Sequence, residues 1–320
     1  MRIDQPIKIE AYLALIAAVL FWGLSFVATK VALEGFSTFT LIFFRFGLAA
    51  VFFLILMTLR GFPSFTIKDH GRVFLVALFE PGLYFIFETI GLQYTTAPKA
   101  SLIIAVIPIV VLVLAFIFLG ERTRLSSLFG IGISVLGIAV LITGDPDFTW
   151  AFGGRLIGDF LIFGSVITAS FYIISVRSLA KRYSAFEITS MQTIYGALFY
   201  LPAFFWELPG VSWSAVTGNS VVALIYLTIF ATIGAFLCYN HALIKVSAPR
   251  AAVFINGIPV VTAIGAWILL GEKLSLTQAG GGLLVLFGVC LTNLSNHRNP
   301  EKGSKESLPV DPSSPYSAGA

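Results

Sequence analysis

Two glutamates and a tyrosine recur at every fourth position in the apolar segment "EPGLYFIFE", which covers residues 80–88. Glu80, Tyr84 and Glu88 would share nearly one face of an α-helix, because four residues make slightly more than one turn. A carboxylate in such a setting can take up a proton or bind the ammonium group of a substrate. An ion pair with Arg45 or Lys99 is the structural alternative. We favour the functional interpretation for Glu88 more than for Glu80.

Arg45 is the other conspicuous charge, because it lies about two turns inside the apolar run 38–59. A charged side chain at that depth is costly, so it is retained for structure or for function. The guanidinium group either extends outward to the interface or is held by carbonyls and one carboxylate, or it binds substrate or controls access. The second half of the chain repeats the pattern of the first, and Gln192 stands there at the place of Arg45. Its side chain is polar but uncharged.

Polar and aromatic residues of other apolar runs complete the candidate site. In "YNHALIK", Tyr239 and Asn240 are expected near the inner membrane boundary, where water can satisfy them. In "FINGIP", Asn256 lies deeper and would hydrogen-bond a substrate across helices. Asp159, by contrast, is expected to serve a helix N-terminus, where a carboxylate is favourable. The aromatic residues expected in the walls of the site are Trp22, Phe171, Tyr172 and Phe236.

No cofactor, metal site or enzymatic activity is expected. The sequence lacks a His-Glu-x-x-His zinc motif, a Walker motif and a pair of aspartates within the apolar runs. The glycine clusters at 130–137 and 280–288 are not phosphate loops, since no predicted strand precedes them and no P-loop lysine follows. Small residues of this kind let helices approach closely, within one chain or between the two chains of a homodimer.

The elements that must position these residues are membrane-spanning helices. Of the 320 residues, 58% are hydrophobic and only 11% are charged, whereas about one quarter is charged in a soluble protein. The apolar runs are about twenty residues long, the length of helix that crosses a bilayer. We expect an all-α integral membrane protein with ten transmembrane helices. These are predicted at residues 11–32, 38–59, 73–92, 99–119, 126–144, 156–176, 187–206, 221–241, 251–270 and 277–294.

Basic residues indicate the orientation of these helices. With the N-terminus inside, fifteen Lys and Arg residues fall in the inner loops and tails. The four that fall outside are Lys30, Lys99, Arg155 and Lys273. Since cytoplasmic loops carry such an excess, we expect a multi-pass protein of the plasma (bacterial inner) membrane with both termini in the cytoplasm. Residues 297–320, rich in Pro, Ser and charge, are expected to form a disordered cytoplasmic tail.

An internal repeat divides the chain into two domains. The segment "IPIVVLVLAFIFLGER", which starts at residue 107, returns 151 residues later as "IPVVTAIGAWILLGEK". Earlier in each half the offset is 147, which places a four-residue difference around the third span. The repeats are expected at 11–144 and 156–294, with five spans each. Because five is odd, the second repeat must enter the membrane from the opposite face, as is common in secondary transporters.

The segments "FWGLSFVATK" and "FFRFGLAA", together with the "LGER" and "LGEK" endings, resemble the drug/metabolite transporter (DMT) superfamily, and specifically its ten-helix EamA family. The resemblance covers residues 11–295. It implies a cavity between the halves, lined largely by spans one, three, four, six, eight and nine. Members of the superfamily export amino acids and related metabolites, and others carry vitamins, nucleotides or sugars. In both endings, glycine is expected to stop the helix and the charged residues to stay at the membrane interface.

Secondary-active transport of a small-molecule substrate is the expected function. The leading hypothesis is export of amino acids or related compounds by alternating access, with proton coupling through Glu88 as one way to drive it. Uptake of a vitamin or heterocycle, riboflavin-like, is the alternative within transport. A non-transporting membrane scaffold or sensor is the alternative outside it. The expected partners are the substrate and the lipid bilayer, and not a nucleic acid.

Overall fold

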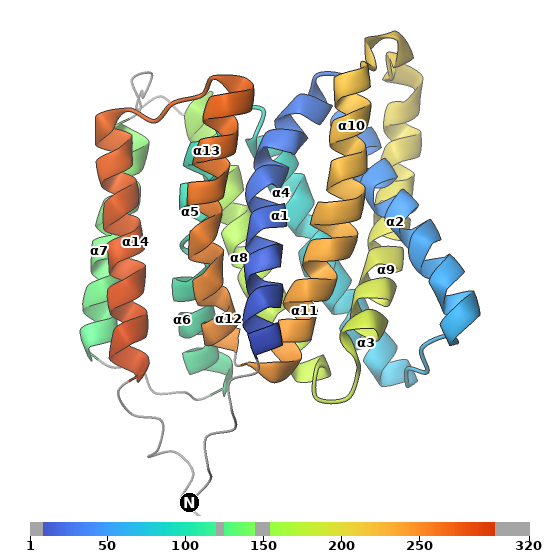
Figure 1. Cartoon of the computed structure of the whole chain (residues 1–320), viewed down its shortest axis with the longest axis horizontal. Coiled ribbons are helices and arrows are strands. Elements are labelled where there is room, and N and C mark those ends of the chain that lie inside the picture. The colour runs from blue at the N-terminus through green and yellow to red at the C-terminus, as the bar shows by residue number, and fades with distance from the viewer. Residues whose placement is uncertain (1–8, 120–124, 145–153, 247, 298–320) are drawn as a thin grey trace, which may run out of the picture.

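The computed structural model describes residues 9–119, 125–144, 154–246 and 248–297. Within these ranges the chain forms ten helical rods that stand side by side (Figure 1). The rods of the first half are α1 (Ile9–Leu33), α2 (Thr38–Arg60), α3–η1–α4 (Ile67–Ala77, Leu78–Leu83 and Tyr84–Gly91), α5–α6 (Ala97–Ile104 and Ile107–Leu119) and α7 (Leu125–Thr143). Those of the second half are α8 (Arg155–Leu179), α9 (Ala185–Glu207), α10–η4–α11 (Gly218–Tyr226, Leu227–Gly234 and Ala235–Lys245), α12–η5–α13 (Ala248–Phe254, Ile255–Gly257 and Ile258–Leu270) and α14 (Leu276–His297).

Most of these rods can cross a bilayer. Within the described residues, seven are long and apolar enough to do so by length and composition; of the others, α9 packs on α2, and α7 packs on α14. The third rod begins at Ile67 and not at residue 73, and the eighth continues to Lys245 and not only to residue 241. The all-helical prediction is confirmed, with these boundaries shifted.

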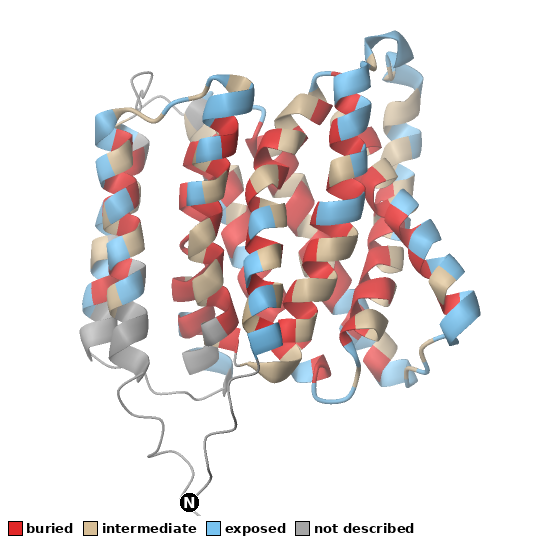
Figure 2. Cartoon of the chain, viewed as in Figure 1, coloured by how far each residue is buried: buried red, intermediate tan, exposed pale blue. Residues whose placement is uncertain are grey.

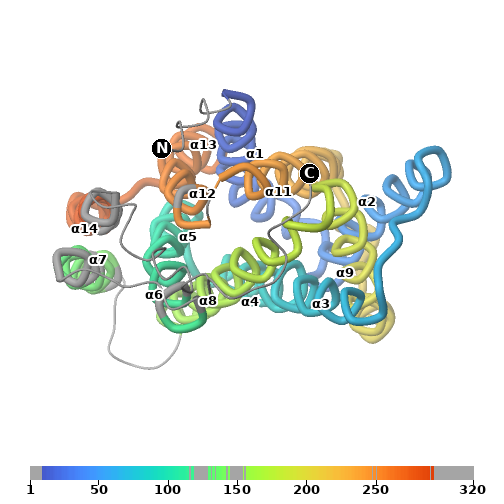
Figure 3. Tube along the Cα trace, turned by 90° about the horizontal axis from the view of Figure 1, so that it is seen from below, coloured from blue at the N-terminus to red at the C-terminus, as the bar shows by residue number. Residues whose placement is uncertain are grey.

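The two halves run through the molecule in opposite directions. In Figure 1 the turn between α1 and α2 lies at the upper edge, whereas the matching turn between α8 and α9 lies at the lower edge. Contacts repeat accordingly: α4 packs on α8 as α11 packs on α1, and α6 packs on α8 as α13 packs on α1. The rods α2 and α9 pack on each other, as do α7 and α14, at opposite ends of the molecule (Figure 3). This pattern is that of two inverted five-helix repeats related by an approximate twofold axis.

The four-residue difference between the repeats lies in one loop. The helices α2 and α9 end at Arg60 and Glu207, which are 147 residues apart. The helices that follow, α3 and α10, begin at Ile67 and Gly218, which are 151 residues apart. The extra residues therefore precede the third rod of the second repeat, so the rods themselves can match along their length.

The third, fourth and ninth rods are interrupted halfway. Pro108 and Pro259 lack the backbone N–H that a continuous helix requires, and α5 gives way to α6, and α12 to α13, just before them. In the third rod the interruption is at Glu80, whose backbone is extended (φ −148°, ψ 116°), next to Pro81. These interruptions place irregular backbone in the interior of the molecule, which a membrane protein tolerates where the backbone is buried in protein or lines a cavity.

Glycine determines how closely α7 approaches α14. A Cβ atom on Gly281 would lie 2.6 Å from the backbone nitrogen of Leu141, and one on Gly137 would lie 2.6 Å from the backbone nitrogen of Val285. At these positions the clusters therefore pack helices within one chain. A Cβ atom on Gly280, in contrast, would have nothing within 4 Å.

Apolar side chains cover the outside of the bundle. Figure 2 shows buried residues toward the middle of the rods and exposed ones on the outward faces. Large hydrophobic side chains that are exposed include those of Leu13, Val51 and Phe287, and in a bilayer they would contact lipid tails. Trp206, at the end of α9, and Trp213, between α9 and α10, are exposed, and amphipathic rings near helix ends favour the headgroup region.

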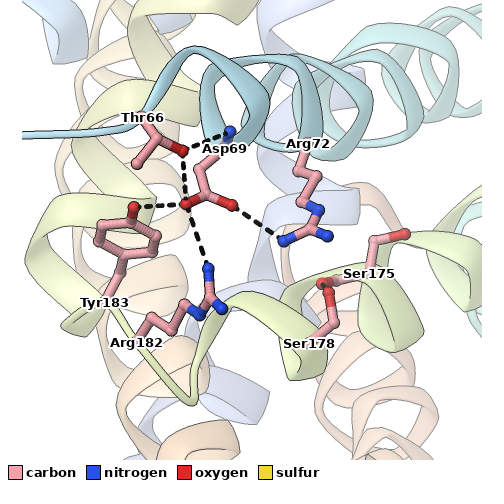
Figure 4. Close-up of polar contacts among 7 residues, drawn as sticks. All are labelled: Thr66, Asp69, Arg72, Ser175, Ser178, Arg182 and Tyr183. Carbon is pink, nitrogen blue, oxygen red and sulfur yellow. Dashed lines mark hydrogen bonds and ion pairs between the residues drawn. The ribbon is translucent and has the colours of Figure 1, made fainter.

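A polar network fastens the start of α3 to the turn between α8 and α9 (Figure 4). The Asp69 carboxylate accepts hydrogen bonds from the hydroxyls of Thr66 and Tyr183, at 2.9 and 2.7 Å. Arg72 and Arg182 approach the same carboxylate at 2.9 and 3.6 Å. The hydrogen bond to Asp69 raises the pKa of Tyr183, so the phenol remains a donor at neutral pH. These partners explain why the third rod begins with polar residues that hydropathy alone placed outside it.

Candidate functional site

A cavity lies between the two repeats at the middle of the rods. The empty space within it, including space open to solvent, is about 480 Å³. Its lining residues are Trp22, Ser25, Phe26, Arg45, Glu80, Tyr84, Phe85, Glu88, Ile104, Ile107, Ala169, Tyr172, Ile173, Tyr239, Ile255 and Ile258. The predicted site residues among them are Trp22, Arg45, Tyr84, Glu88, Tyr172 and Tyr239. No cluster of three or more metal-ligating side chains occurs in the part of the chain that the structure describes.

Arg45 reaches this cavity from α2 and is 2% exposed. Its Nε donates a hydrogen bond of 2.7 Å to the hydroxyl of Thr232, and its guanidinium carbon lies 4.3 Å from the centroid of the Phe85 ring. The ring face attracts the cation, so hydroxyl and ring together position the group. Its Nη2 has no hydrogen-bond partner among the described residues. The expected tie to carbonyls and one carboxylate is not what the structure shows.

Both glutamates of the "EPGLYFIFE" segment reach the cavity, although the helix between them is irregular. Glu80 lies at the interruption η1, whereas Glu88 lies in the regular helix α4. Tyr200 of α9 supports the interruption, because its hydroxyl donates to the carbonyls of Pro81, at 3.0 Å, and Gly82. Satisfying these carbonyls stabilises the interruption at this depth, and the interruption decides where Glu80 lies.

Neither glutamate is in direct contact with a cationic side chain of the described residues, although the charge of Arg45 acts on both. Glu88 is 1% exposed and accepts a hydrogen bond of 3.2 Å from the Thr89 hydroxyl. Glu80 is 6% exposed and makes no hydrogen bond or ion pair with any residue in the described ranges. The alternative of an ion pair with Arg45 or Lys99 is therefore wrong for this conformation. A buried carboxylate that no cation contacts directly is unfavourable, so the arrangement favours a ligand or a proton beside it.

Tyr172 connects the cavity to a buried polar network. Its hydroxyl donates to Oδ1 of Asn240 at 2.7 Å, and Nδ2 of Asn240 donates to Thr189 and Gln192 at 2.9 and 3.3 Å. Asn240 is fully buried and is not a lining residue, so the expectation that water satisfies it near the boundary is wrong. Gln192, the counterpart of Arg45, belongs to this network and not to the cavity wall.

Tyr239 lies in the cavity wall and not at the membrane boundary. It is 1% exposed, its ring centroid is 5.0 Å from that of Trp22, and its hydroxyl has no hydrogen-bond partner among the described residues. The indole N–H of Trp22 donates to the carbonyl of Ala231 at 3.1 Å and so fixes this ring. The expectation that water satisfies Tyr239 is wrong, because neighbouring helices bury it and α11 continues beyond it to Lys245.

Three other predicted residues do not line the cavity. Asn256 is half-buried in the interruption η5, and its two side-chain polar atoms have no partner within the described ranges. Phe171 stacks on Phe79 with ring centroids 5.1 Å apart. Phe236 packs edge-to-face against Trp22, at 5.4 Å, from behind the wall. Residue type alone could not separate these from the residues that do face the cavity.

Lys99 and Asp159 form a buried ion pair beside the site. Their Nζ and Oδ2 atoms are 2.8 Å apart, and both side chains are 1% exposed. The hydroxyl of Thr95 adds a hydrogen bond to Asp159 at 3.1 Å. Asp159 therefore neutralises Lys99, which corrects the expectation that it serves only a helix N-terminus. Lys99, expected outside the membrane, is enclosed by protein.

The Gly-Glu ending of α13 also has more than an interfacial role. Gly271 ends the helix with φ +66°, as expected. Glu272, however, accepts hydrogen bonds from Nζ of Lys30 and, at 2.9 Å, from the backbone N–H of Ala97 at the start of α5. It thereby caps α5 and joins the two halves at the upper edge. The matching Glu121 lies outside the described residues.

Much of the cavity wall comes from repeat-related positions. Each half contributes equivalent residues from its first rod and from the interruption of its fourth rod. The pairs are Ile104 with Ile255, Ile107 with Ile258, Trp22 with Ala169, Ser25 with Tyr172 and Phe26 with Ile173. Sequence reasoning missed most of these apolar residues, although the repeated prolines that follow them were a usable signal.

The charges of the cavity do not repeat. At the same offsets, Arg45 corresponds to Gln192 and Glu88 to Tyr239. Glu80 corresponds to an alanine at position 231. All three charged residues that line the cavity therefore come from the first half of the chain, so the wall is symmetric in shape and asymmetric in charge.

Comparison with known proteins gives consistent matches over most of the chain. The model of the EamA-like transporter family matches residues 9–143 and 156–294. An uncharacterized transporter of Archaeoglobus fulgidus is 32% identical over 88% of this chain and 97% of its own length. A probable terminal-alkyne amino-acid exporter of Streptantibioticus cattleyicolor is 24% identical over 89% of this chain and 93% of its own. A solved crystal structure with 19% identity has a TM-score of 0.68, over 89% of this chain and 98% of that one, which shows the same fold.

Proposed function

This chain belongs to the EamA-like transporter family, and from that premise we propose that it exports amino acids or related small metabolites as a secondary-active transporter. The cavity between the repeats is the proposed substrate site. Its Trp22, Tyr84, Tyr172 and Tyr239 are proposed to contact substrate, and Arg45 and Glu88 to bind its charges or couple its transport. Asn240 acts through Tyr172 in this proposal, and Asn256 has no contact that gives it a role.

The observation that carries the proposal is the combination of opposite charges and apolar walls in one enclosed space. The cavity holds one guanidinium group and two carboxylates, while most of its remaining lining is aromatic or aliphatic. Amino acids carry an ammonium group, a carboxylate and often an apolar side chain. The relative in S. cattleyicolor that is named as a probable amino-acid exporter supports this substrate class.

Inverted repeats support alternating access as the mechanism. Two halves of opposite orientation can rock against each other around a central site, which opens first to one face and then to the other. We propose the plasma membrane as the location and the cytoplasm as the side of both termini, because the basic residues are concentrated in the loops on that side. Proton coupling through Glu88 is proposed as the driving force.

Counterflow in proteoliposomes tests this function directly. The full chain is reconstituted in liposomes loaded with one unlabelled compound, and uptake of the same labelled compound is followed for amino acids and for riboflavin. We expect exchange of at least one amino acid above that of protein-free liposomes. Exchange of riboflavin alone would replace export of amino acids by vitamin transport. Absence of exchange for every compound, with folded protein in the bilayer, would contradict the proposal.

A further inference from the structure

Protein contacts position Arg45 and Glu88 of the cavity but leave polar atoms of both without a direct ionic contact, and Glu80 lines the same cavity. Thr232 holds Nε of Arg45 at 2.7 Å, and Phe85 lies under the guanidinium plane, yet Nη2 has no partner within the described residues. On the other side, Glu88 has one hydroxyl contact, and Glu80 has none in that same part of the chain. We propose that these groups bind the two ends of one zwitterion: the substrate carboxylate on Arg45 and its ammonium group on Glu80 and Glu88. This inference rests on the proposed function.

Compounds of other charge types satisfy this cavity less completely. An anion pairs with Arg45 but gives neither carboxylate a direct ionic contact, and an uncharged compound gives none of the three groups such a contact. A simple amine pairs with the carboxylates but leaves Nη2 of Arg45 buried without an acceptor. Because unpaired buried charges and donors are unfavourable, the zwitterion is the class that satisfies both kinds of group at once.

The asymmetry between the repeats orients the substrate. All three charged groups belong to the first half, so the zwitterionic end lies against η1, α2 and α4. The wall from the second half is mainly apolar, with Ile173, Ile255 and Ile258 on it. The side chain of the substrate therefore points toward the second half, where the isoleucines limit its size.

A series of matched ligands tests this binding mode on the unaltered protein. Binding of L-leucine, L-methionine and L-phenylalanine to the purified full chain is compared with that of their amides, which lack the carboxylate, and their N-acetyl derivatives, which lack the ammonium group. We expect at least one parent amino acid to bind about 10- to 100-fold more tightly than both of its derivatives, since each derivative loses a charged hydrogen bond.

Substitutions then assign each end of the ligand to its residue. In Arg45→Gln the preference for the amino acid over its amide should fall to within about threefold, while the preference over the N-acetyl derivative remains. In Glu88→Gln and Glu80→Gln the preference for the amino acid over its N-acetyl derivative should fall, while the preference over its amide remains. Arg60→Gln, at the exposed end of the same helix α2, and Glu34→Gln, in the exposed turn after α1, are the matched controls and should leave both preferences unchanged.

Each outcome decides a separate point. If an amino acid binds but its amide or N-acetyl derivative binds equally well, the two-ended binding mode is wrong while amino-acid transport stands. If the preferences persist in all three variants, the assigned contacts are wrong. If Arg45→Gln does not fold, the comparison of amino acid with amide on the unaltered protein still tests the carboxylate end. If no compound of the series binds, while riboflavin does, the proposed function itself fails.

Discussion

Buried charges in this protein differ in what lies beside them. Lys99 and Asp159 are 2.8 Å apart and neutralise each other. Arg45 and Glu88 are equally buried, but neither forms an ion pair with a residue in the described ranges. A charge that protein already neutralises contributes to the fold, whereas an unpaired charge becomes favourable only with a ligand or a proton. The two kinds should therefore respond differently to substitution.

Glu88→Gln is expected to remove the pH dependence of transport without lowering the yield of protein in the membrane. The amide of glutamine keeps the shape of the side chain but cannot take up or release a proton as a carboxylate does. The charged and titratable residues around Glu88 are Arg45, Glu80, Tyr84, Tyr172, Tyr200 and Tyr239. Flux is measured in proteoliposomes across a series of pH values. If the variant keeps both the flux and its pH dependence, the proton-carrier role of Glu88 is wrong.

For the buried ion pair, the expected effect is on stability. Lys99→Met leaves the Asp159 carboxylate buried without this counter-charge, and removal of one partner of such a pair typically costs about 3–5 kcal/mol. The free energy of unfolding is measured in mixed micelles for Lys99→Met, for Asp159→Leu and for the double variant. We expect the double variant to regain most of the loss. Equal destabilisation in all three would mean that the charges are not coupled.

Sequence patterns located these charged residues but not their partners. Arg45 and Glu88 were conspicuous because charges are rare in long apolar runs, whereas Lys99 was expected on the outer side. Which of them pair depends on how helices distant in the sequence pack, and no local signal carries this. The same limit explains Tyr239 and Asn240: the sequence showed polar residues near a helix end, whereas neighbouring helices bury both.

At the scale of elements, hydropathy predicted the rods well and their ends less well. The interruptions before Pro108 and Pro259 follow from proline chemistry and from the repeat. The start of the third rod at Ile67 could not be predicted in this way. Asp69 lowers the summed hydropathy of the segment, whereas in the structure its carboxylate is paired and buried. Helices that are apolar on all sides also do not indicate which face is turned toward a cavity.

Contact between α7 and α14 gives a prediction at this scale. Gly281→Ala is expected to lower the melting temperature, because the new Cβ atom would lie 2.6 Å from the backbone nitrogen of Leu141, and backbone atoms cannot move aside cheaply. Gly280→Ala is the matched control, since its Cβ atom would meet nothing within 4 Å and alanine favours the helix. Melting of the purified variants is measured side by side. Equal effects at the two positions would contradict the close packing.

Considered as a whole molecule, the transporter combines a nearly symmetric frame with an asymmetric site. The frame follows from duplication: equivalent rods pack equivalently, and equivalent isoleucines line the cavity from both halves. Inverted repeats of this kind are common in secondary transporters, and the proposed alternating access requires two related conformations of this frame. The charges lie in one half only, so substrate contacts can remain with that half while the other moves. The repeat predicted the frame from sequence, but the asymmetry became clear only with the cavity.

The inverted frame makes a direct prediction about accessibility. Glu34 and Lys181 are 147 residues apart, occupy equivalent turns of the two repeats and are both exposed. In a parallel duplication, cysteines at these positions would react with a membrane-impermeant maleimide from the same side. In this structure they must react from opposite sides. With Cys238 and Cys290 replaced by alanine, we expect Glu34→Cys to be labelled in intact cells, and Lys181→Cys only after permeabilisation. Labelling of both variants in intact cells would contradict the inverted repeat. Labelling of Lys181→Cys in intact cells, and of Glu34→Cys only after permeabilisation, would keep the inversion and reverse the proposed orientation.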